Sequence, residues 1–257
     1  MPVPLQVARR YRRPRVVLVH GFTQTGASWA GIAGELEAEF EVVTPELPGH
    51  GRAPLPRPGS GLAEAAHFLG ETGGRSGYVG YSLGARCCLH LALDSPELVE
   101  RLVLVGVQPG IVDEKERELR RQADDRLADA LEAGGDAAVP AFIETWLAGP
   151  LFAHLNERQA DRPARLSNRA AGLAASLRTA GTGTQAPLWD RLGELEMPVL
   201  VVVGADDAKF RPVAEATAEL IGANARLAVM AGCRHAACFE RPDAFVALLR
   251  EFLGTSA

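Results

Sequence analysis

Short runs of apolar, β-branched residues alternate in this chain with longer segments of helical pattern, and this alternation constrains the fold most. Residues 15–20 (RVVLVH) form a nearly continuous apolar run, which is typical of a strand covered on both faces. Similar runs predict strands at 41–44, 76–81, 101–107, 198–203 and 225–230. Helical patterns follow at 83–93, 212–221 and 242–253. The sequence therefore predicts an α/β fold in which a mostly parallel sheet is flanked by helices.

One long segment, residues 109–195, interrupts the alternation. It contains no convincing strand, and its apolar residues recur at helical spacing. These residues are Leu119, Ala123, Leu127, Ala130 and Leu131. A helical insertion between two late strands of a sheet is most simply a cap over the carboxyl edge of that sheet. We therefore expect a core made of residues 1–108 and 196–257, with a helical cap at 109–195.

Composition and charge exclude several classes of protein. The chain has 257 residues and a net charge of −5, so no electrostatic feature favours nucleic acid as a partner. No run of about 18 apolar residues predicts a membrane span, and residues 1–6 lack the apolar stretch of a secretory signal. The sequence has no Gly-rich phosphate loop and no His/Cys cluster at ligand spacing. We expect a cytoplasmic protein with no cofactor, no metal, and no nucleic-acid or membrane partner; its oligomeric state stays open.

A serine lies at a turn between a predicted strand and a predicted helix. Residues 80–84 (GYSLG) match the pattern Gly-x-Ser-x-Gly, in which glycines on both sides relieve the crowding of a sharp turn. Such a turn exposes Ser82 at the carboxyl edge of the sheet. A serine hydroxyl is a poor nucleophile or base until a neighbouring group removes its proton, so the pattern predicts a nearby histidine.

Two of the six histidines, His154 and His235, follow Ser82 by enough sequence to come from another loop. His154 lies in the predicted cap, whereas His235 follows the last predicted strand, at the edge where Ser82 emerges. We therefore assign His235 as the base. The acid that orients the histidine should follow the strand at 198–203, where both Asp206 and Asp207 are candidates.

At this point the motifs resemble those of the α/β-hydrolases over nearly the whole chain. A narrower resemblance exists to the 2-succinyl-6-hydroxy-2,4-cyclohexadiene-1-carboxylate (SHCHC) synthases of menaquinone biosynthesis. The segments that carry both resemblances are HGFT at 20–23, LPGHG at 47–51, GYSLGAR at 80–86, PGI at 109–111, RQAD at 121–124, Phe142 with Trp146, PLF at 150–152, Arg165, GLA at 172–174, GTGTQ at 181–185 and DAKF at 207–210.

The family resemblance implies specific roles at the site. Its Gly-x-x-Asp spacing selects Asp207 as the acid, beside Ser82 and His235. The backbone N–H groups of Phe22 and Leu83 would form an oxyanion hole, which stabilises charge when its donors are aimed in advance. The chain departs from the family pattern close to His235, where Arg234 stands in place of a glycine and Cys238 in place of a histidine.

The narrower resemblance implies a lyase. The substrate of these synthases, a succinyl-enolpyruvyl-hydroxycyclohexene carboxylate, loses pyruvate after a ring proton is removed, and the deprotonated serine can act as the base. Such a partner is a small-molecule polycarboxylate, and arginine suits a planar carboxylate. Arg86 lies one helical turn beyond Ser82. The remaining residues that we expect to bind substrate are Arg121, Arg165, Trp146, Tyr81 and Phe152.

Two alternatives remain from the residues alone. A serine esterase or related hydrolase, acting on a small anionic or ester substrate, would use Ser82 as a covalent nucleophile through an acyl-enzyme. A ligand-binding module without activity would need no intact serine, histidine and aspartate, and the presence of all three argues against it. Because one fold hosts many functions, the choice depends on the site.

Overall fold

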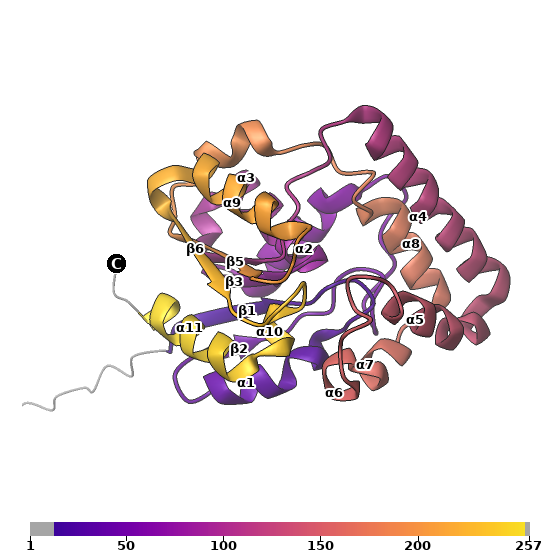
Figure 1. Ribbon diagram of the computed structural model, residues 1–257, viewed down its shortest axis with the longest axis horizontal. Helices are drawn as coiled ribbons and strands as arrows, with labels where there is room; N and C mark the ends of the chain where they lie inside the picture. The colour runs from indigo at the N-terminus through magenta and orange to yellow at the C-terminus, as the bar shows by residue number, and fades with distance from the viewer. Residues whose placement is uncertain (1–12, 255–257) are drawn as a thin grey trace, which may run out of the picture.

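A six-stranded sheet forms the centre of the molecule, as the computed structural model shows for residues 13–254 (Figure 1). The strand order is β2-β1-β3-β4-β5-β6, and each neighbouring pair is parallel. The strands are β1 (Arg15–Val19), β2 (Glu41–Val43), β3 (Ser76–Tyr81), β4 (Val99–Val105), β5 (Val199–Gly204) and β6 (Ala225–Met230). The expectation of a parallel sheet flanked by helices is thereby confirmed.

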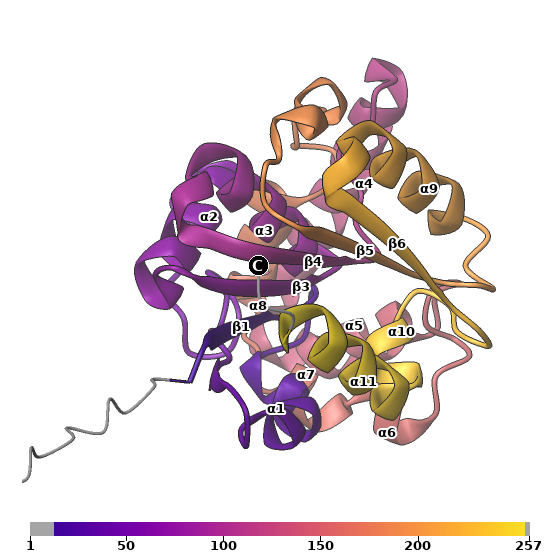
Figure 2. The same cartoon turned by 90° about the vertical axis from the view of Figure 1, so that its left-hand side faces the viewer.

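Helices cover both faces of this sheet (Figure 2). One face carries α2 (Gly61–Gly73), α3 (Leu83–Asp94) and α9 (Phe210–Ile221). The other face carries α1 (Ala30–Leu36), α10 (Ala237–Glu240) and α11 (Pro242–Gly254). Successive strand residues serve opposite cores, because side chains alternate along a strand: Val17 packs with the first set of helices and Leu18 with the second.

Five helices are inserted between β4 and β5, and they gather at one side of the molecule in Figure 1. They are α4 (Glu114–Gly134), α5 (Val139–Leu147), α6 (Glu157–Ala160), α7 (Arg162–Leu166) and α8 (Ala170–Ala180). These helices share an apolar cluster of their own, which includes Leu131, Ile143 and Leu173. The long helix α4 packs along α8.

The buried face of α4 differs from the apolar stripe that the sequence suggested. Leu119 is 56% exposed and Ala130 is exposed as well, whereas Asp124, Ala128 and Leu131 are buried. The predicted stripe was therefore right at Leu131, wrong at Leu119 and Ala130, and partly right at Ala123 and Leu127, which are half-buried. The physical reason is that a charged side chain, Asp124, occupies a buried position on this helix.

The predicted strand boundaries hold to within two residues. Strand β4 ends at Val105 rather than at 107, because Gly106 has a φ of +59° that a strand cannot continue. No helix within residues 13–254 is long and apolar enough to cross a membrane. Residues 1–6, from which the lack of a secretory signal was inferred, lie outside the described residues.

Candidate active site

Ser82 lies at the sharp turn between β3 and α3, with a φ of +52°. Such a left-handed backbone is strained for a residue with a side chain. The close approach of surrounding backbone explains the flanking glycines: a Cβ on Gly80 would lie 2.4 Å from the oxygen of Gly84, and one on Gly84 would lie 2.3 Å from the oxygen of Val19. The local sequence therefore forces the serine hydroxyl out at the carboxyl edge of the sheet.

His235 and Asp207 reach Ser82 from two other loops. The Ser82 Oγ lies 3.2 Å from His235 Nε2, and His235 Nδ1 lies 3.2 Å from Asp207 Oδ2. The second carboxylate oxygen of Asp207 accepts the N–H of Phe210 at 3.1 Å. Burial alone would raise the pKa of Asp207, but the hydrogen bonds from His235 and from backbone N–H groups outweigh burial and lower it. Asp207 is thus an ionised acceptor at neutral pH.

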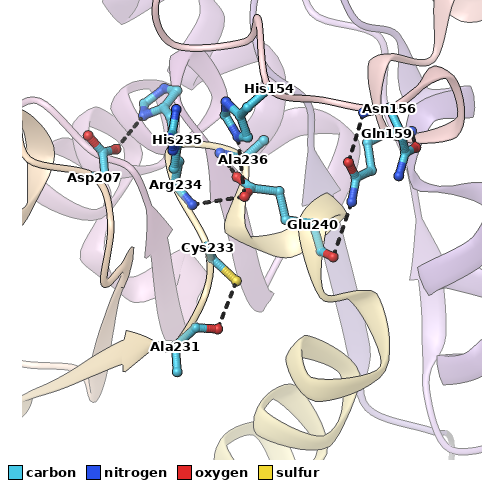
Figure 3. A network of polar contacts seen from close by, with 10 residues as sticks. All are labelled: His154, Asn156, Gln159, Asp207, Ala231, Cys233, Arg234, His235, Ala236 and Glu240. Carbon is cyan, nitrogen blue, oxygen red and sulfur yellow. Dashed lines mark hydrogen bonds and ion pairs between the residues drawn. The ribbon is translucent and has the colours of Figure 1, made fainter.

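The structure separates the alternatives that the sequence left open. Asp206 is exposed, so Asp207 is the carboxylate that faces the histidine. His154 lies between α5 and α6, and its nearest acidic partner is Glu240, with Nε2 3.2 Å from Oε2. Figure 3 shows both histidines, and a dashed line joins His235, but not His154, to Asp207. Of the two, His235 is the one within hydrogen-bond distance of Ser82.

The loop after β1 places Phe22 in the lining of the cavity that contains the serine. The oxygen of Gly21 lies 2.9 Å from His20 Nδ1 and accepts the N–H of Gln24 at 3.1 Å. Because a peptide group is planar and trans, the N–H of Phe22 points away from these partners. Leu83 is the first residue of α3, so its N–H has no acceptor within the helix. Phe22 and Leu83 both line the cavity that contains Ser82.

His20 and His50 hold this loop in place as neutral rings. His20 Nε2 accepts the N–H of Leu47 at 3.0 Å, and burial, with a smaller effect from His50, lowers the pKa of His20 to about 3. Burial likewise lowers the pKa of His50 to about 4, and its Nε2 faces the N–H of Thr23 at 3.4 Å. Both rings are therefore acceptors at neutral pH.

Arg165, which we expected to bind substrate, instead binds the same loop. Its guanidinium donates to the hydroxyl of Thr23 and to the oxygen of Phe22 at 3.3 Å, and only 2% of the residue is exposed. Asn168 Nδ2 donates to the oxygen of Thr23 at 2.6 Å. Thr23 has a φ of +68°, so these contacts from the inserted helices support a strained residue.

Arg86 lines the Ser82 cavity, as we expected from its place one turn along α3. Its guanidinium donates to the oxygen of Ala180 at 2.7 Å and to Gln185 Oε1 at 3.2 Å. Burial lowers the pKa of Arg86 to about 10, which leaves it charged at neutral pH. A guanidinium carries five N–H donors, so these two contacts leave donors for an anion.

The second arginine of the cavity is Arg120, and sequence reasoning missed it in favour of Arg121. Arg120 lines the cavity and its Nε donates to both oxygens of Asp124 at 3.0 Å. Arg121 is exposed on the outer side of α4 and binds Glu118 with an N–O distance of 2.6 Å. The spacing of Arg120 and Asp124 could have indicated this orientation, since residues four apart lie on the same face of a helix.

Aromatic side chains form the apolar wall of the cavity. Trp146 and Phe152 lie among its lining residues, with the Phe152 ring 6.0 Å from the His235 ring. Tyr81 does not line it: this side chain is buried in the core on the α11 face of the sheet, where its ring lies 5.4 Å from that of Phe239. Tyr81 thus supports the histidine from behind, 5.5 Å between ring centres.

Two further residues contact His235 and were missing from the predicted site. Phe210 packs against its ring with the centroids 4.3 Å apart and the ring planes tilted by 38°, and it belongs to the DAKF segment that carries the family resemblance. Gly106 also lies against this ring, because a Cβ on it would approach His235 Cε1 to 2.9 Å. No pattern in the sequence marked Gly106, because its importance depends on the folded position of residue 235.

A parallel sheet, a serine at a strand–helix turn, and helices inserted over the carboxyl edge together define the α/β-hydrolase fold. The chain belongs to the alpha/beta hydrolase family, which matches residues 16–248.

Similar proteins in other organisms span nearly the whole chain. A protein of Serratia proteamaculans (strain 568) named 2-succinyl-6-hydroxy-2,4-cyclohexadiene-1-carboxylate synthase is 32% identical over 248 residues, covering 94% of this chain and 93% of that protein. A Bacillus subtilis (strain 168) protein, which carries the same name provisionally, is 32% identical over 252 residues, 93% of this chain and 89% of that protein.

Solved structures of other proteins are also similar to this chain over nearly its whole length. MenH from S. aureus has a TM-score of 0.87 and 28% identity, and the match covers 96% of each chain. An enol-lactonase from Burkholderia xenovorans LB400 has a TM-score of 0.79 over 96% of this chain and 94% of that one, at 21% identity. The second similarity shows a shared fold alone, because other chemistries occur on this fold.

Proposed function

We propose that this protein is a lyase that eliminates pyruvate from a succinyl-enolpyruvyl-hydroxycyclohexene carboxylate to form SHCHC, a step of menaquinone biosynthesis. The observation that carries the proposal is one cavity that contains Ser82 and His235 together with Arg86 and Arg120. The names of relatives at about 30% identity over nearly their full length support it. The cytoplasmic location expected from the sequence belongs to the same proposal.

In this proposal, proton transfer is carried out by a catalytic triad of Ser82, His235 and Asp207. His235 Nε2 takes the proton of the Ser82 hydroxyl across 3.2 Å, and the serine oxygen then removes a proton from the ring carbon beside the succinyl carbonyl. Asp207 fixes the histidine tautomer and stabilises its cation. The electrons of the broken C–H bond pass through the conjugated system, and the C–O bond to the enolpyruvyl group breaks. Pyruvate leaves as its enolate and takes up a proton.

The oxyanion hole stabilises an enolate rather than a tetrahedral intermediate. As the ring proton leaves, negative charge develops on the succinyl carbonyl oxygen, and the N–H groups of Phe22 and Leu83 are aimed at it. Donors that are already oriented need no reorganisation during the reaction, which is why such sites commonly contribute several kcal/mol. The tight support of the Thr23 loop by Arg165 and Asn168 serves this requirement.

The substrate carboxylates bind at the arginine end of the cavity. Arg86 and Arg120 are the charged residues among those that line it, beside the titratable His235. Asp124 binds the Nε of Arg120, which fixes the guanidinium and leaves its two terminal NH₂ groups for a substrate carboxylate. The aromatic wall of Phe22, Trp146 and Phe152 would contact the ring and the enolpyruvyl group.

The helices between β4 and β5 act as a cap that must move during binding. The cavity has a volume of about 90 Å³, whereas sites for ligands of this size usually measure roughly 300 Å³ or more. Phe152 and Trp146, which narrow it, both belong to the inserted segment. We infer that substrate enters when the part of this segment that carries Trp146 and Phe152 moves outward, while Arg165 and Asn168 stay bound to the Thr23 loop, and that its return excludes water from the enolate.

Incubation of the purified protein with the enolpyruvyl precursor tests the proposal, with pyruvate followed through lactate dehydrogenase and NADH oxidation. We expect pyruvate release that is stoichiometric with loss of precursor, and a loss of about 10³-fold or more in kcat for Ser82→Ala. Hydrolysis of p-nitrophenyl esters is the comparison. A protein that leaves the precursor unchanged while hydrolysing simple esters at ordinary enzymatic rates would be an esterase, and the lyase proposal would be abandoned.

A further inference from the structure

We propose that Glu240 is a positioning residue that holds the His235 loop and links it to the inserted helices. The proposal rests on the proposed function only for the role of His235. Glu240 is the last residue of the short helix α10, and its side chain is 7% exposed. Its carboxylate makes no contact with Ser82 or Asp207, so it acts through the backbone of the histidine.

Both carboxylate oxygens of Glu240 accept backbone N–H groups on either side of His235. Oε2 accepts the N–H of Arg234 at 2.9 Å, and Oε1 accepts the N–H of Ala236 at 3.0 Å. Figure 3 shows these two contacts, with the histidine between them. Because the two flanking peptide groups are fixed, the Cα of His235 has little freedom to move relative to α10.

The His235 loop depends on such support because it lies outside regular structure. Strand β6 ends at Met230, and the chain then passes so close to β5 that a Cβ on Gly204 would lie 2.3 Å from the oxygens of Cys233 and Arg234. The imidazole must reach Ser82 at one end and Asp207 at the other. A small shift of its backbone lengthens both hydrogen bonds, and a displacement of about 1 Å can cost roughly 100-fold in rate.

Glu240 also connects this loop to the inserted segment. His154, which lies between α5 and α6, places Nε2 3.2 Å from Glu240 Oε2. This contact is close but not aligned as a hydrogen bond, since His154 Nε2 makes none within the described residues. Gln159 of α6 donates to the backbone oxygen of Glu240 at 3.3 Å. A displacement of the inserted segment would therefore also displace the loop that carries His235.

Glu240→Gln tests the role with little change in shape. An amide offers one oxygen, so one of the two backbone N–H groups would face an N–H₂ donor. We expect kcat for pyruvate release to fall about 10- to 100-fold, with KM changed less than about 3-fold. Glu240→Asp, which is shorter but keeps the charge, should restore part of the rate. Glu251→Gln is the matched control, because Glu251 binds Arg226 on the surface of α11 and should leave both constants unchanged.

A second measurement needs no natural substrate. The rate at which a small fluorophosphonate labels Ser82 reports the activation of the serine, and Glu240→Gln should lower this rate by a similar factor. The downfield proton resonance of His235 Nδ1 should broaden in the same variant. A wild-type protein that releases no pyruvate would reject the proposed function, while the labelling rates would still decide the role of Glu240.

A purely structural role predicts a different pattern. Glu240→Gln would then melt at a lower temperature but keep the wild-type kcat and labelling rate per folded molecule at low temperature, and this result would overturn the proposal. His154→Ala tests the link to the inserted segment, and we expect its kcat to fall about 2- to 5-fold through looser placement of the loop. An unchanged kcat in His154→Ala would overturn that link.

Discussion

Arg165 donates hydrogen bonds to the oxygen of Phe22 and to the hydroxyl of Thr23, so a residue of the inserted helices holds the loop that carries Phe22, one of the two proposed oxyanion-hole donors. Asn168 adds a bond to the oxygen of the same threonine and another to the N–H of Gly51. Hydrogen bonds therefore join the inserted segment to the loop after β1 that contains Phe22 and Thr23. Arg165 is better explained as a positioning residue than as a carboxylate ligand.

Arg165→Met should consequently lower kcat more than it raises KM. Loss of one well-placed oxyanion donor usually costs about 10²- to 10³-fold in kcat, and a loosened loop should cost about 10- to 100-fold. KM for the precursor should change less than about 3-fold. Steady-state kinetics of pyruvate release measure both constants. A large rise in KM with an unchanged kcat would instead assign Arg165 to substrate binding.

Arg120 and Arg121 are neighbours in sequence with opposite surroundings, which makes them a matched pair. Arg120→Gln, whose amide can still donate to Asp124, removes a charge from the cavity and should raise KM by about 10- to 100-fold, as expected for a charge-assisted contact. Arg121→Gln should stay within about 2-fold of wild type, because the exposed pair with Glu118 contributes little. Equal effects of the two substitutions would contradict the placement of the anion site.

The residues set by local backbone chemistry could be predicted from the sequence. Ser82 is marked by Gly80 and Gly84, since the turn needs both glycines within five residues, and His235 is marked by its place after the last strand. The parallel sheet followed from the apolar strand runs, because strands covered on both faces show no alternation. The choice of Asp207 over Asp206 needed either the family spacing or the structure.

Residues set by contacts distant in sequence could not be predicted. The buried face of α4 carries Arg120 and Asp124, so hydrophobic periodicity gave only part of this face, and the family resemblance favoured Arg121 over its neighbour. Arg165 was recognised as important, but a sequence does not show whether a guanidinium meets a ligand or a backbone carbonyl. The partner of Glu240 is backbone, and backbone N–H groups leave no signature in residue types.

Gly106→Ala is expected to disturb His235 directly. Gly106 has a φ of +59°, and a Cβ there would lie 2.9 Å from His235 Cε1. Gly135→Ala is the control, because its φ is +57° and nothing lies within 4 Å of an added Cβ. Both changes should cost about 1–3 kcal/mol of folding free energy, because a positive φ of this kind is strained for alanine. Only Gly106→Ala should lower kcat, by about 10- to 100-fold. Denaturant melts and kinetics on both variants provide the comparison.

The buried histidines predict how stability depends on pH. Burial lowers the pKa of His20 to about 3 and that of His50 to about 4, whereas both titrate near 6.5 in an unfolded chain. At pH values between the folded-state and unfolded-state pKa, the unfolded chain binds more protons than the folded protein. The free energy of unfolding therefore rises with pH in this range. This contribution is complete above about pH 6.5 and is lost progressively as the pH falls toward about 4.

His50→Gln should therefore flatten the pH dependence of stability. A neutral amide can accept the N–H of Thr23 without a protonated form, so the variant loses the part of the acid sensitivity that His50 causes. For wild type we expect this single group to contribute a few kcal/mol between about pH 7 and pH 4. Urea unfolding at several pH values within that range, on wild type and variant, measures the difference. Parallel stability curves for the two proteins would show that His50 is not held neutral by the fold.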